Sequence, residues 1–499
     1  MSPMLLLHSV LFTAKSLNNY IAEKYPFVWV LFCCYMSKSV VQYNRGDDMQ
    51  ALLRQHAEAI YKTAIKENMP NAAVEKAIEQ LLNQNNQSVS NGKTVLVAIG
   101  KAGWEMAKTA YDILKDRIHS GIVITKYDHV PKEYKTQNTG CEMRNCKANG
   151  KESTLLYQGQ GCAPVAYLGS IEIYEAGHPV VDFNGICATK RALELTSSLD
   201  GNDTVLFLVS GGGSALFESV DCPLEKMQEL TTAMLKCGAN INEINTIRKH
   251  ISNVKGGSFA KAVYPARVFA VVLSDVVGDD LSTIASGPAC ADATTVENCL
   301  EILEKYNISV DKDVLSLIKR ETPKEITNAT HIVSGSVSYL CKSARAVAQS
   351  LGYTATVMDS AVVCDAEELT QRIGKIALEQ ASEPRAYIFG GEITVKVMGS
   401  GKGGRNQELA LRCAEKIKGR NNMAVFCVGS DGTDGPTDAA GGYVDGKTWE
   451  FIEKSGKSPE EYLKNNDSYN ALEKSNGLVF TGSTGTNVND LYVLLIQSS

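Results

Sequence analysis

The sequence predicts an α/β protein in which helices are layered around largely parallel or mixed sheets. Its 499 residues exceed the usual size of a single domain. Hydrophobic residues make up 44% and charged residues 21%, which is typical of a globular protein and excludes wholesale disorder, a collagen-like repeat or a coiled-coil rod. From residue 47 onward, short β-branched runs alternate with helical patterns. Strands that are apolar throughout belong to sheets covered on both faces, so this alternation indicates α/β layers.

The individual elements follow one another from Asp47. Apolar residues at helical spacing predict a helix over 49–68, and Pro70 suits the first turn of a second helix. Two further helices are expected at Trp104–Lys115 and Gln407–Ile417. The expected strands are Thr94–Ile99, Gly121–Thr125, Thr204–Val209, Val268–Leu273, His331–Val333, Tyr387–Phe389 and Ala424–Val428.

We expect an N-terminal appendage at 1–46, which its composition sets apart from the rest, then an α/β domain at 47–325 and a second α/β domain at 326–499. A polar stretch at 128–168 is interpreted as a surface insertion in the first domain. The appendage is basic and poor in acidic residues, and its apolar run at 27–36 is too short to span a bilayer. We expect a targeting or disordered segment there, and a cytoplasmic protein with a mitochondrial location as the alternative.

The charge and the cysteines restrict the partners. A formal charge of −6 offers no global attraction to nucleic acid or to an anionic membrane, so we expect neither partner. The 14 cysteines include no CxxC pair, and the spacing of Cys141, Cys146 and Cys162 does not favour structural zinc. Reduced thiols of an intracellular protein are the preferred interpretation. The expected ligands are small molecules, bound by a monomer or a homodimer.

Two glycine-bearing loops follow strands, at the edge where open α/β sheets bind ligands. In Gly100–Gly103, small residues admit a close ligand and Lys101 adds a positive charge beside a helix N-terminus. In Ser210–Ser214, three consecutive glycines are typical of a nest of backbone N–H groups that binds phosphate or carboxylate. A tight turn, with a solvated lysine in the first loop, is the alternative for each.

Acidic residues in two later loops are candidate ligands for a cation. The loop that follows Val268–Leu273 holds Asp275 and Asp279, and crowded carboxylates repel one another unless a positive group lies among them. Magnesium held by one or two carboxylates and substrate phosphates suits such a loop, and a solvated turn is the alternative. Asp431 and Asp434, in a later glycine-rich loop, are the second candidates.

The loop Gly399–Arg405 resembles a Walker A motif but does not match it. Lys396 stands where that motif needs its first glycine, and a glycine follows Lys402 instead of serine or threonine. What remains is a glycine-rich loop that delivers Arg405 and Asn406 to the start of a helix. Arginine in such a place favours bidentate recognition of phosphate or carboxylate.

Other signatures are weaker. The sequence contains no GxSxG, so it gives no support for a serine-hydrolase elbow. Gly100 and Gly103 supply only half of a GxGxxG fingerprint, which disfavours nicotinamide binding. His178 is interpreted as a structural histidine.

Nine stretches of the chain together carry a family resemblance. In order, from about residue 48 to 498, they are VLVAIGKAGWEMA, IEIYEAGHPVVD, LVSGGGSALF, INEINTIRKHISNVKGG, VVLSDVVGDDLSTIASGP, FGGEITV, GSGKGGRNQELAL, SDGTDGPTDAAG and TGSTGTNVND. With them the chain resembles the class II glycerate kinases, a two-domain family whose C-terminal part is called the MOFRL domain. The resemblance implies ATP-dependent phosphorylation of D-glycerate with Mg²⁺, in serine and glycerate metabolism, at an active site in the cleft between two α/β domains. Family members generally yield 2-phosphoglycerate, although the eukaryotic branch has also been described as making the 3-phosphate.

The resemblance carries a key lysine onto Lys101 and a key arginine onto Arg405, where we expect them at the charge that develops on the transferred group. Asp275 is expected to be a third catalytic residue, and Arg248 and Glu392 to bind the substrate. The nucleotide and its phosphates are expected at Gly100, Ser210, Gly211, Gly212, Gly213, Ser214, Gly403, Gly404 and Asn406. The expected Mg²⁺ ligands are Asp275 and Asp279 first, then Asp431 and Asp434.

Two other functions remain open at this point. Some relatives have been labelled hydroxypyruvate reductases, so an NAD(P)H-dependent reductase is the first alternative. A nucleotide-sensing protein without catalysis is the second, and the presence of both Lys101 and Arg405 speaks against it.

Overall fold

The computed structural model describes residues 47–84, 92–135, 163–379 and 381–498. The chain divides into two units, residues 1–52 and 53–499, and only the start of one helix is described in the first unit. The expected appendage at 1–46 lies outside the described residues. So do most of the expected insertion at 128–168 and the cysteines Cys141, Cys146 and Cys162.

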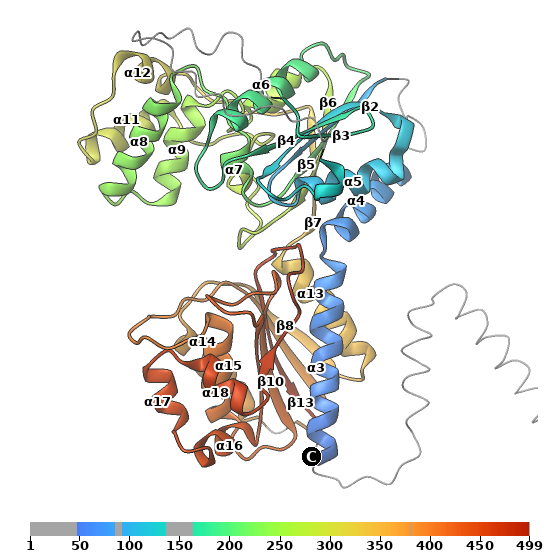
Figure 1. Cartoon of the computed structure of the whole chain (residues 1–499), viewed down its shortest axis with the longest axis vertical. Coiled ribbons are helices and arrows are strands. Elements are labelled where there is room, and N and C mark those ends of the chain that lie inside the picture. The colour runs from blue at the N-terminus through green and yellow to red at the C-terminus, as the bar shows by residue number, and fades with distance from the viewer. Residues whose placement is uncertain (1–46, 85–91, 136–162, 380, 499) are drawn as a thin grey trace, which may run out of the picture. The chain divides into compact units, whose positions relative to one another are not determined.

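The first sheet has the strand order β3-β4-β2-β1-β5-β6-β7 within the described residues (Figure 1). All neighbouring strands are parallel except the pair β3 and β4. The strands are β1 (Thr94–Ile99), β2 (Ile118–Lys126), β3 (Ala166–Leu168), β4 (Ile171–Ala176), β5 (Thr204–Val209), β6 (Arg267–Leu273) and β7 (Ala329–Gly335).

The strand order reverses at β1. The chain continues from β1 to β2 on one side, and β5 lies on the other side. The loops that follow β1 and β5 therefore lie at a topological switch point, where parallel sheets bind ligands. One core of this part of the chain contains buried side chains of β1, β2, β5 and β6 together with those of the helices α6 (Phe183–Thr196) and α10 (Ser258–Val263). Within it, the rings of Phe207, Phe217 and Phe259 pack together with centroids 4.9 to 5.9 Å apart.

Other helices surround this sheet or pack with one another. A separate core joins α8 (Leu224–Lys236), α9 (Ile241–Ile251), α11 (Val296–Lys305) and α12 (Lys312–Ile318). The remaining helices here are α4 (Pro70–Gln84), α5 (Gly103–Leu114), α7 (Gly213–Leu216) and the 3₁₀ turns Lys115–Arg117, Lys132–Tyr134 and Ile284–Ser286.

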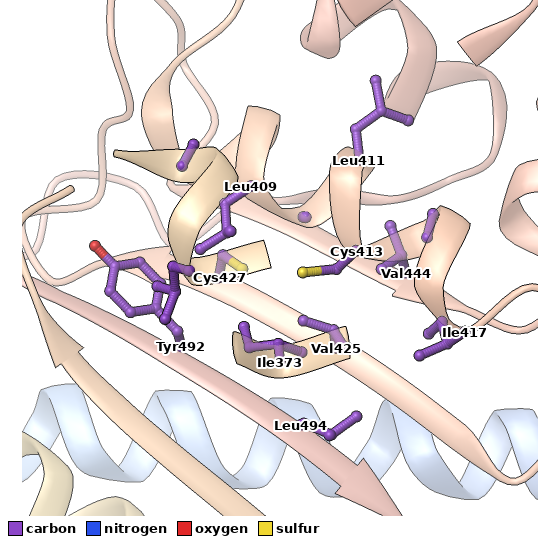
Figure 2. Close-up of a cluster of buried hydrophobic side chains, with 14 of the residues drawn as sticks. Ile373, Leu409, Leu411, Cys413, Ile417, Val425, Cys427, Val444, Tyr492 and Leu494 are labelled. Carbon is purple, nitrogen blue, oxygen red and sulfur yellow. The ribbon is translucent and has the colours of Figure 1, made fainter. Parts of the chain in front are cut away.

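The second sheet has the order β12-β11-β10-β13-β9-β8, and only β8 and β9 are parallel. Side chains of α15 pack against β10 and β13, and Figure 2 shows Leu409 and Cys413 of the helix close to Val425, Cys427 and Tyr492 of the strands. The strands are β8 (Thr354–Val362), β9 (Arg385–Gly391), β10 (Met423–Gly429), β11 (Gly441–Asp445), β12 (Leu478–Val479) and β13 (Asp490–Ile496). The helices are α13 (Val337–Ser350), α14 (Ala366–Ala377), α15 (Arg405–Lys416), α16 (Thr448–Lys454), α17 (Pro459–Lys464) and α18 (Ser468–Lys474).

From Leu53 onward, helix α3 (Asp47–Glu67) packs on the second sheet, not on the first (Figure 1). The Tyr61 ring meets the ring of Phe426 on β10 at 5.9 Å, and the Arg54 guanidinium lies 5.0 Å from the ring centre of Tyr443 on β11. His56 Nδ1 lies 2.9 Å from the Tyr353 hydroxyl.

The expected α/β fold with largely parallel or mixed sheets is confirmed; the first sheet is largely parallel and the second is mixed. The expected domain division differs from the strand pairing in two respects. Strand β7 at 329–335 pairs with β6, so the first sheet extends beyond the expected boundary at 325. Helix α3, assigned to the first domain from sequence, contacts the second sheet. In the part of the chain that the structure describes, no helix is both long and apolar enough to cross a membrane.

Candidate active site

The loops that follow β1 and β5 are joined by hydrogen bonds. The backbone N–H of Lys101 donates to the carbonyl of Gly211 at 2.8 Å. Ser210 Oγ accepts from the Ala102 N–H at 3.0 Å and donates to the Ile99 carbonyl at 3.1 Å. Ser210 is buried, so its hydroxyl fixes the two loops together and does not face a ligand. The two loops expected to bind phosphate therefore form one surface.

Gly212 is the position where this surface meets the side chains of Lys101 and His178. Its φ of +84° lies in the left-handed region that favours glycine. A Cβ built there would lie 3.1 Å from Nε2 of His178 and 3.2 Å from Cγ of Lys101. A Cβ at the preceding Gly211 would collide with the Asp275 carboxylate. The ends of β1, β4, β5 and β6 thus bring Lys101, His178, the glycine loop and Asp275 together.

The charges of this cluster are unevenly compensated. The Lys101 ammonium makes no hydrogen bond or ion pair with the residues that the structure describes. Burial lowers the pKa of His178, and the positive charges of Lys101 and Lys126 lower it further. Burial raises the pKa of Asp275, the charge of Lys101 lowers it, and the charge of Glu392 raises it. A neutral imidazole, a carboxylate and an unpaired ammonium therefore lie around the glycine loop.

Arg248 belongs to a buried ionic network behind the loop. It lies near the end of α9, which begins with a capping box between Asn240 and Glu243. Its Nη2 donates to the Ser214 carbonyl at 2.9 Å and lies 3.5 Å from Oε2 of the buried Glu218.

The other cation of this network is Lys255. Its Nζ lies 3.1 Å from the same Glu218 oxygen and donates to the Phe217 carbonyl at 2.8 Å. Burial lowers the pKa of Lys255 to about 8. The network ties the α7 backbone in place, and Arg248 as a ligand for the substrate carboxylate stays a prediction.

Arg405 is the first residue of α15 and is held by two carboxylates. Its Nε donates to Oδ2 of Asp490 at 2.6 Å, and its Nη2 donates to Oδ1 at 3.3 Å. Its Nη1 donates to Oε1 of Glu392 at 2.5 Å. Asp490 is buried, whereas the Glu392 side chain is half exposed. The expected substrate ligand Glu392 is therefore an ion-pair partner of Arg405 in this structure.

Asp434 caps the N-terminus of α15. Its Oδ2 accepts from the Gln407 N–H at 2.8 Å, and its Oδ1 accepts from the Asn406 backbone N–H at 3.1 Å and from Asn406 Nδ2 at 3.3 Å. Burial raises the pKa of Asp434 to about 6, and these backbone hydrogen bonds oppose the rise. The geometry explains Asp434 and Asn406 as parts of the helix cap, so it does not favour the expected roles of Asp434 in metal binding and Asn406 in nucleotide binding.

A cavity of about 560 Å³ opens beside this helix N-terminus. The loop that forms one wall is held by the side chains of Asn465 and Asn466, which accept backbone N–H bonds from Ser400 and from Met398 and Gly399. A Cβ at Gly403 or Gly404 would collide with Ser468 or Asp434, so protein packing itself demands these glycines. The lining residues are Ile393, Thr394, Val395, Val397, Gly401, Gly403, Gly404, Arg405, Glu408, Asp431, Thr433, Asp434, Gly435, Pro436 and Asn466.

The four carboxylates expected to hold a metal are not equivalent. Among the described residues, no group of three or more histidine, cysteine, aspartate or glutamate side chains has the arrangement of a metal site. Asp275 lies against Gly211, and Oδ1 of Asp279 is buried without a hydrogen-bond partner in the described part of the chain. Asp431 Oδ1 accepts from the Thr433 N–H at 3.0 Å. Oxygen donors beside a phosphate loop fit Mg²⁺, which binds proteins through few carboxylates, and Asp275, which lies against Gly211, is the better match.

Two residues of these clusters were not placed at a site by the sequence analysis. His178 follows β4, a strand that the sequence analysis did not recognise; had 171–176 been assigned as a strand, the strand-end argument would have included this histidine. Asp490 opens β13 and meets Arg405 across 85 positions of sequence, and no local pattern indicates such a pairing.

Two family models match the chain. The first is described as a domain of unknown function, DUF4147, and covers residues 56–319; the second is the MOFRL family and covers residues 385–490. The D-glycerate 2-kinase of Thermotoga maritima is 45% identical over 452 residues, which span 89% of this chain and 98% of that protein. An Agrobacterium vitis protein, provisionally named a hydroxypyruvate reductase, is 34% identical over 81% of this chain and 87% of its own length. The crystal structure of a glycerate kinase from Thermotoga maritima matches with a TM-score of 0.78 at 45% identity, over 89% of this chain and 99% of that chain.

Proposed function

This chain belongs to the family that combines the DUF4147 and MOFRL regions and includes the glycerate 2-kinase of Thermotoga maritima, and from that membership we propose that it transfers the γ-phosphoryl group of ATP to D-glycerate and forms 2-phosphoglycerate. The observation that carries the proposal is the cluster around Gly211 and Gly212, where Lys101, His178 and Asp275 converge at the switch point of the first sheet. Phosphoryl transfer requires positioning and charge neutralisation more than covalent chemistry. An unpaired ammonium beside a glycine loop supplies both.

We assign the phosphates to the first site. Backbone N–H groups of the Gly211–Ser214 loop bind phosphate oxygens, and the Lys101 ammonium neutralises the charge on the transferred group. Asp275, with Asp279 as a second oxygen donor, holds Mg²⁺. When bound, Mg²⁺ neutralises the phosphate charge and holds the phosphates in register. Lys101 and the N–H groups then orient the γ-phosphoryl group toward the acceptor hydroxyl.

We assign the nucleoside part of ATP to the cavity beside α15. Its volume of about 560 Å³ falls in the range of small-molecule sites. Its walls combine apolar side chains, among them Val395, Val397 and Pro436, with the Arg405 guanidinium. Apolar walls suit a flat purine ring, and a guanidinium suits the adjoining phosphates.

Arg405 is preorganised for this role by Asp490. The buried carboxylate fixes Nε and Nη2, so the guanidinium plane has a defined direction. The half-exposed Glu392 holds Nη1 and is the partner that an incoming anion must displace. Glu392 is then free to accept a hydrogen bond from a glycerate hydroxyl. A site that combines the two sheets stays a prediction, and the influence of the Glu392 charge on the pKa of Asp275 supports it.

A parallel assay tests the proposed reaction against the reductase alternative. Purified protein is given D-glycerate, ATP and Mg²⁺ in one reaction, and hydroxypyruvate with NADH in another. Formation of ADP without oxidation of NADH supports the kinase, and the reverse result supports the reductase. If neither ADP formation nor NADH oxidation is detected, both enzymatic functions are contradicted. NMR of the phosphorylated product then distinguishes position 2 from position 3.

A pair of neighbouring substitutions tests the nucleoside assignment. Val397 and Met398 are exposed to nearly the same extent, at 74% and 73%, but only Val397 lines the cavity. Val397→Glu places a charge and a longer side chain where the uncharged purine would pack, and it should raise the KM for ATP at least about fivefold, because a carboxylate resists burial against an apolar ring. Met398→Glu is the matched control and should leave it unchanged. Equal effects of the two variants on the KM for ATP would contradict the assignment of the nucleoside to this cavity.

A further inference from the structure

His178 is the ionisable side chain of the first site whose role nothing above explains. It is half buried, and its imidazole makes no hydrogen bond with any residue that the structure describes. A half-buried imidazole without a protein partner in the described residues is free to bond to a ligand bound at the glycine loop. The other histidine of this region has such a partner, because His129 Nδ1 lies 2.8 Å from the Lys101 carbonyl.

The geometry places Nε2 of His178 close against Gly212 in the glycine loop. A Cβ built on Gly212 would lie 3.1 Å from this nitrogen and 3.2 Å from Cγ of Lys101. Since Gly212 has no side chain, the imidazole and the lysine stem both come close to the loop backbone, and a group bound to that backbone lies beside both. A substrate hydroxyl there would meet a proton acceptor and lie next to the ammonium that neutralises the phosphoryl group.

The surrounding charges keep this imidazole able to accept a proton. The ionisable groups that act on it are Lys101 from the end of β1, Lys126 from the end of β2 and His129 from the loop that follows β2. All are cationic or neutral, and together with burial they hold the pKa of His178 below its ordinary value of 6.5. The imidazole is therefore neutral at pH 7, with a free lone pair. Asp275, the other basic group of the cluster, is assigned to Mg²⁺, and a metal-bound carboxylate is a weak base.

We propose that His178 is a catalytic residue that accepts the proton of the glycerate hydroxyl during phosphoryl transfer. This inference rests on the proposed kinase function. The hydroxyl oxygen forms a bond to the γ-phosphorus as the bond between that phosphorus and the β,γ-bridging oxygen breaks. The hydroxyl proton passes to Nε2 of His178, and ADP leaves with the bridging oxygen. The imidazolium then releases its proton to solvent, so atoms and charge balance.

The test compares His178→Gln and His178→Ala with His119→Gln. His119 is a suitable control because it is exposed at the start of β2 and accepts a hydrogen bond from the Thr94 N–H. We measure kcat, the KM values for ATP and glycerate, the thermal midpoint and the pH profile of kcat. Positioned acid–base groups contribute roughly 10²–10⁴ in rate. His178→Gln should lower kcat by about that factor, with KM for ATP within about threefold, and should lose the fall of kcat at acidic pH.

Chemical rescue separates proton transfer from a structural role. Added imidazole should restore part of the activity of His178→Ala, and the restored rate should change with the pKa of substituted imidazoles. A His178→Gln enzyme with normal kcat and an intact acidic limb overturns the inference and leaves the kinase assignment standing. Loss of activity with an unchanged acidic limb and no rescue also overturns it, in favour of a positioning role. An inactive wild-type protein contradicts the proposed function itself.

Discussion

Lys101 and Arg405 show two ways in which a protein can hold a cationic side chain at a proposed site. The Lys101 ammonium has no partner among the described residues, and only its backbone is fixed, by Gly211 and Thr125. Arg405 is bound on two sides by Asp490 and Glu392. The lysine side chain is free to change its conformation when a phosphate binds, whereas the orientation of the guanidinium is already fixed by its two carboxylate partners. Substitutions at the two positions should therefore fail in different ways.

Lys101→Ala should lower kcat by about 10²–10³, because it removes an electrostatic group aimed at the transition state. The thermal midpoint should stay within about 2 °C, because the ammonium makes no contact with the described residues whose loss would destabilise the fold. Kinetics and thermal unfolding on the same preparation check both statements. A folded variant with near-normal kcat would remove Lys101 from the mechanism.

Arg405→Lys should not rescue activity, although it keeps the positive charge. A lysine cannot donate to both oxygens of Asp490 and to Glu392 in one plane. We expect kcat/KM for glycerate to fall at least about tenfold, or roughly 1.4 kcal/mol of transition-state stabilisation, and Arg405→Ala to fall further. Steady-state kinetics of the two variants beside wild type measure this. Full activity of Arg405→Lys would mean that charge alone suffices.

Sequence reasoning located the residues at strand ends and helix starts better than the distant residues that pair with them. Lys101 and Asp275 follow apolar strands that are recognisable from composition, and the strand-end argument places both at the same edge. Arg405 follows a glycine run at a helix start. Asp490 could not be found in this way, because its pairing with Arg405 depends on how two distant strands and a helix pack.

At the scale of the element, α15 depends on a capping group from outside its own segment. Gly404, which precedes the helix, has no side chain to cap it, and the carboxylate of Asp434 supplies the acceptors instead. The same carboxylate packs where a Cβ on Gly404 would stand. The loops Ser210–Ser214 and Gly399–Arg405 were both interpreted from sequence as sites that bind a ligand. For Gly403 and Gly404 the structure gives a packing reason as well, which composition alone could not reveal.

Asp434→Asn should change how stability depends on pH. The pKa of Asp434 in the folded protein is about 6, above the ordinary value of 3.8, so the folded state binds an extra proton between these values. Its contribution to stability is fully present below about pH 4 and is lost as the pH rises through 6. Relative to Asp434→Asn, the wild-type free energy of unfolding should therefore fall from pH 4 to pH 7. Urea unfolding at several pH values measures the difference, and parallel curves for the two proteins would contradict it.

The positions of the strands in the sequence were predicted better than the order of the strands in each sheet. The runs at 94–99, 204–209 and 424–428 are apolar and match β1, β5 and β10. Strand β4 was not predicted, because apolar and polar residues alternate in its sequence IEIYEA. The strand end that presents His178 was therefore missed as well. Sheet order is set by packing between distant segments. This is why the boundary expected at 325 separates β7 from the sheet in which it pairs.

At the scale of the whole molecule, α3 is the clearest case of tertiary packing that overrides chain order. It precedes the first sheet in sequence, and yet its Tyr61 and Arg54 side chains meet aromatic rings of β10 and β11. Leu53, Ala57, Ile60 and Ala64 are fully buried on one face of the helix, as its apolar spacing predicts. Composition identified that face, but nothing in the sequence indicates which sheet covers it.

Two truncations separate α3 from the residues that precede it. A protein that starts at Asp47 should keep its activity and its thermal midpoint within about 2 °C, because the buried face of α3 starts at Leu53 and every proposed site residue follows it.

A protein that starts at Pro70 loses the whole helix and exposes Phe426 and Tyr443. Each large apolar side chain removed from the core costs roughly 1.5–3 kcal/mol, so the loss of Leu53, Ile60 and Tyr61 together is comparable to the whole stability of a typical domain. We expect the second truncation to unfold or precipitate, as measured by thermal unfolding and by recovery in the soluble fraction. If the shorter protein folds and phosphorylates glycerate, α3 is dispensable; if the longer one fails to fold, residues 1–46 contribute to the core.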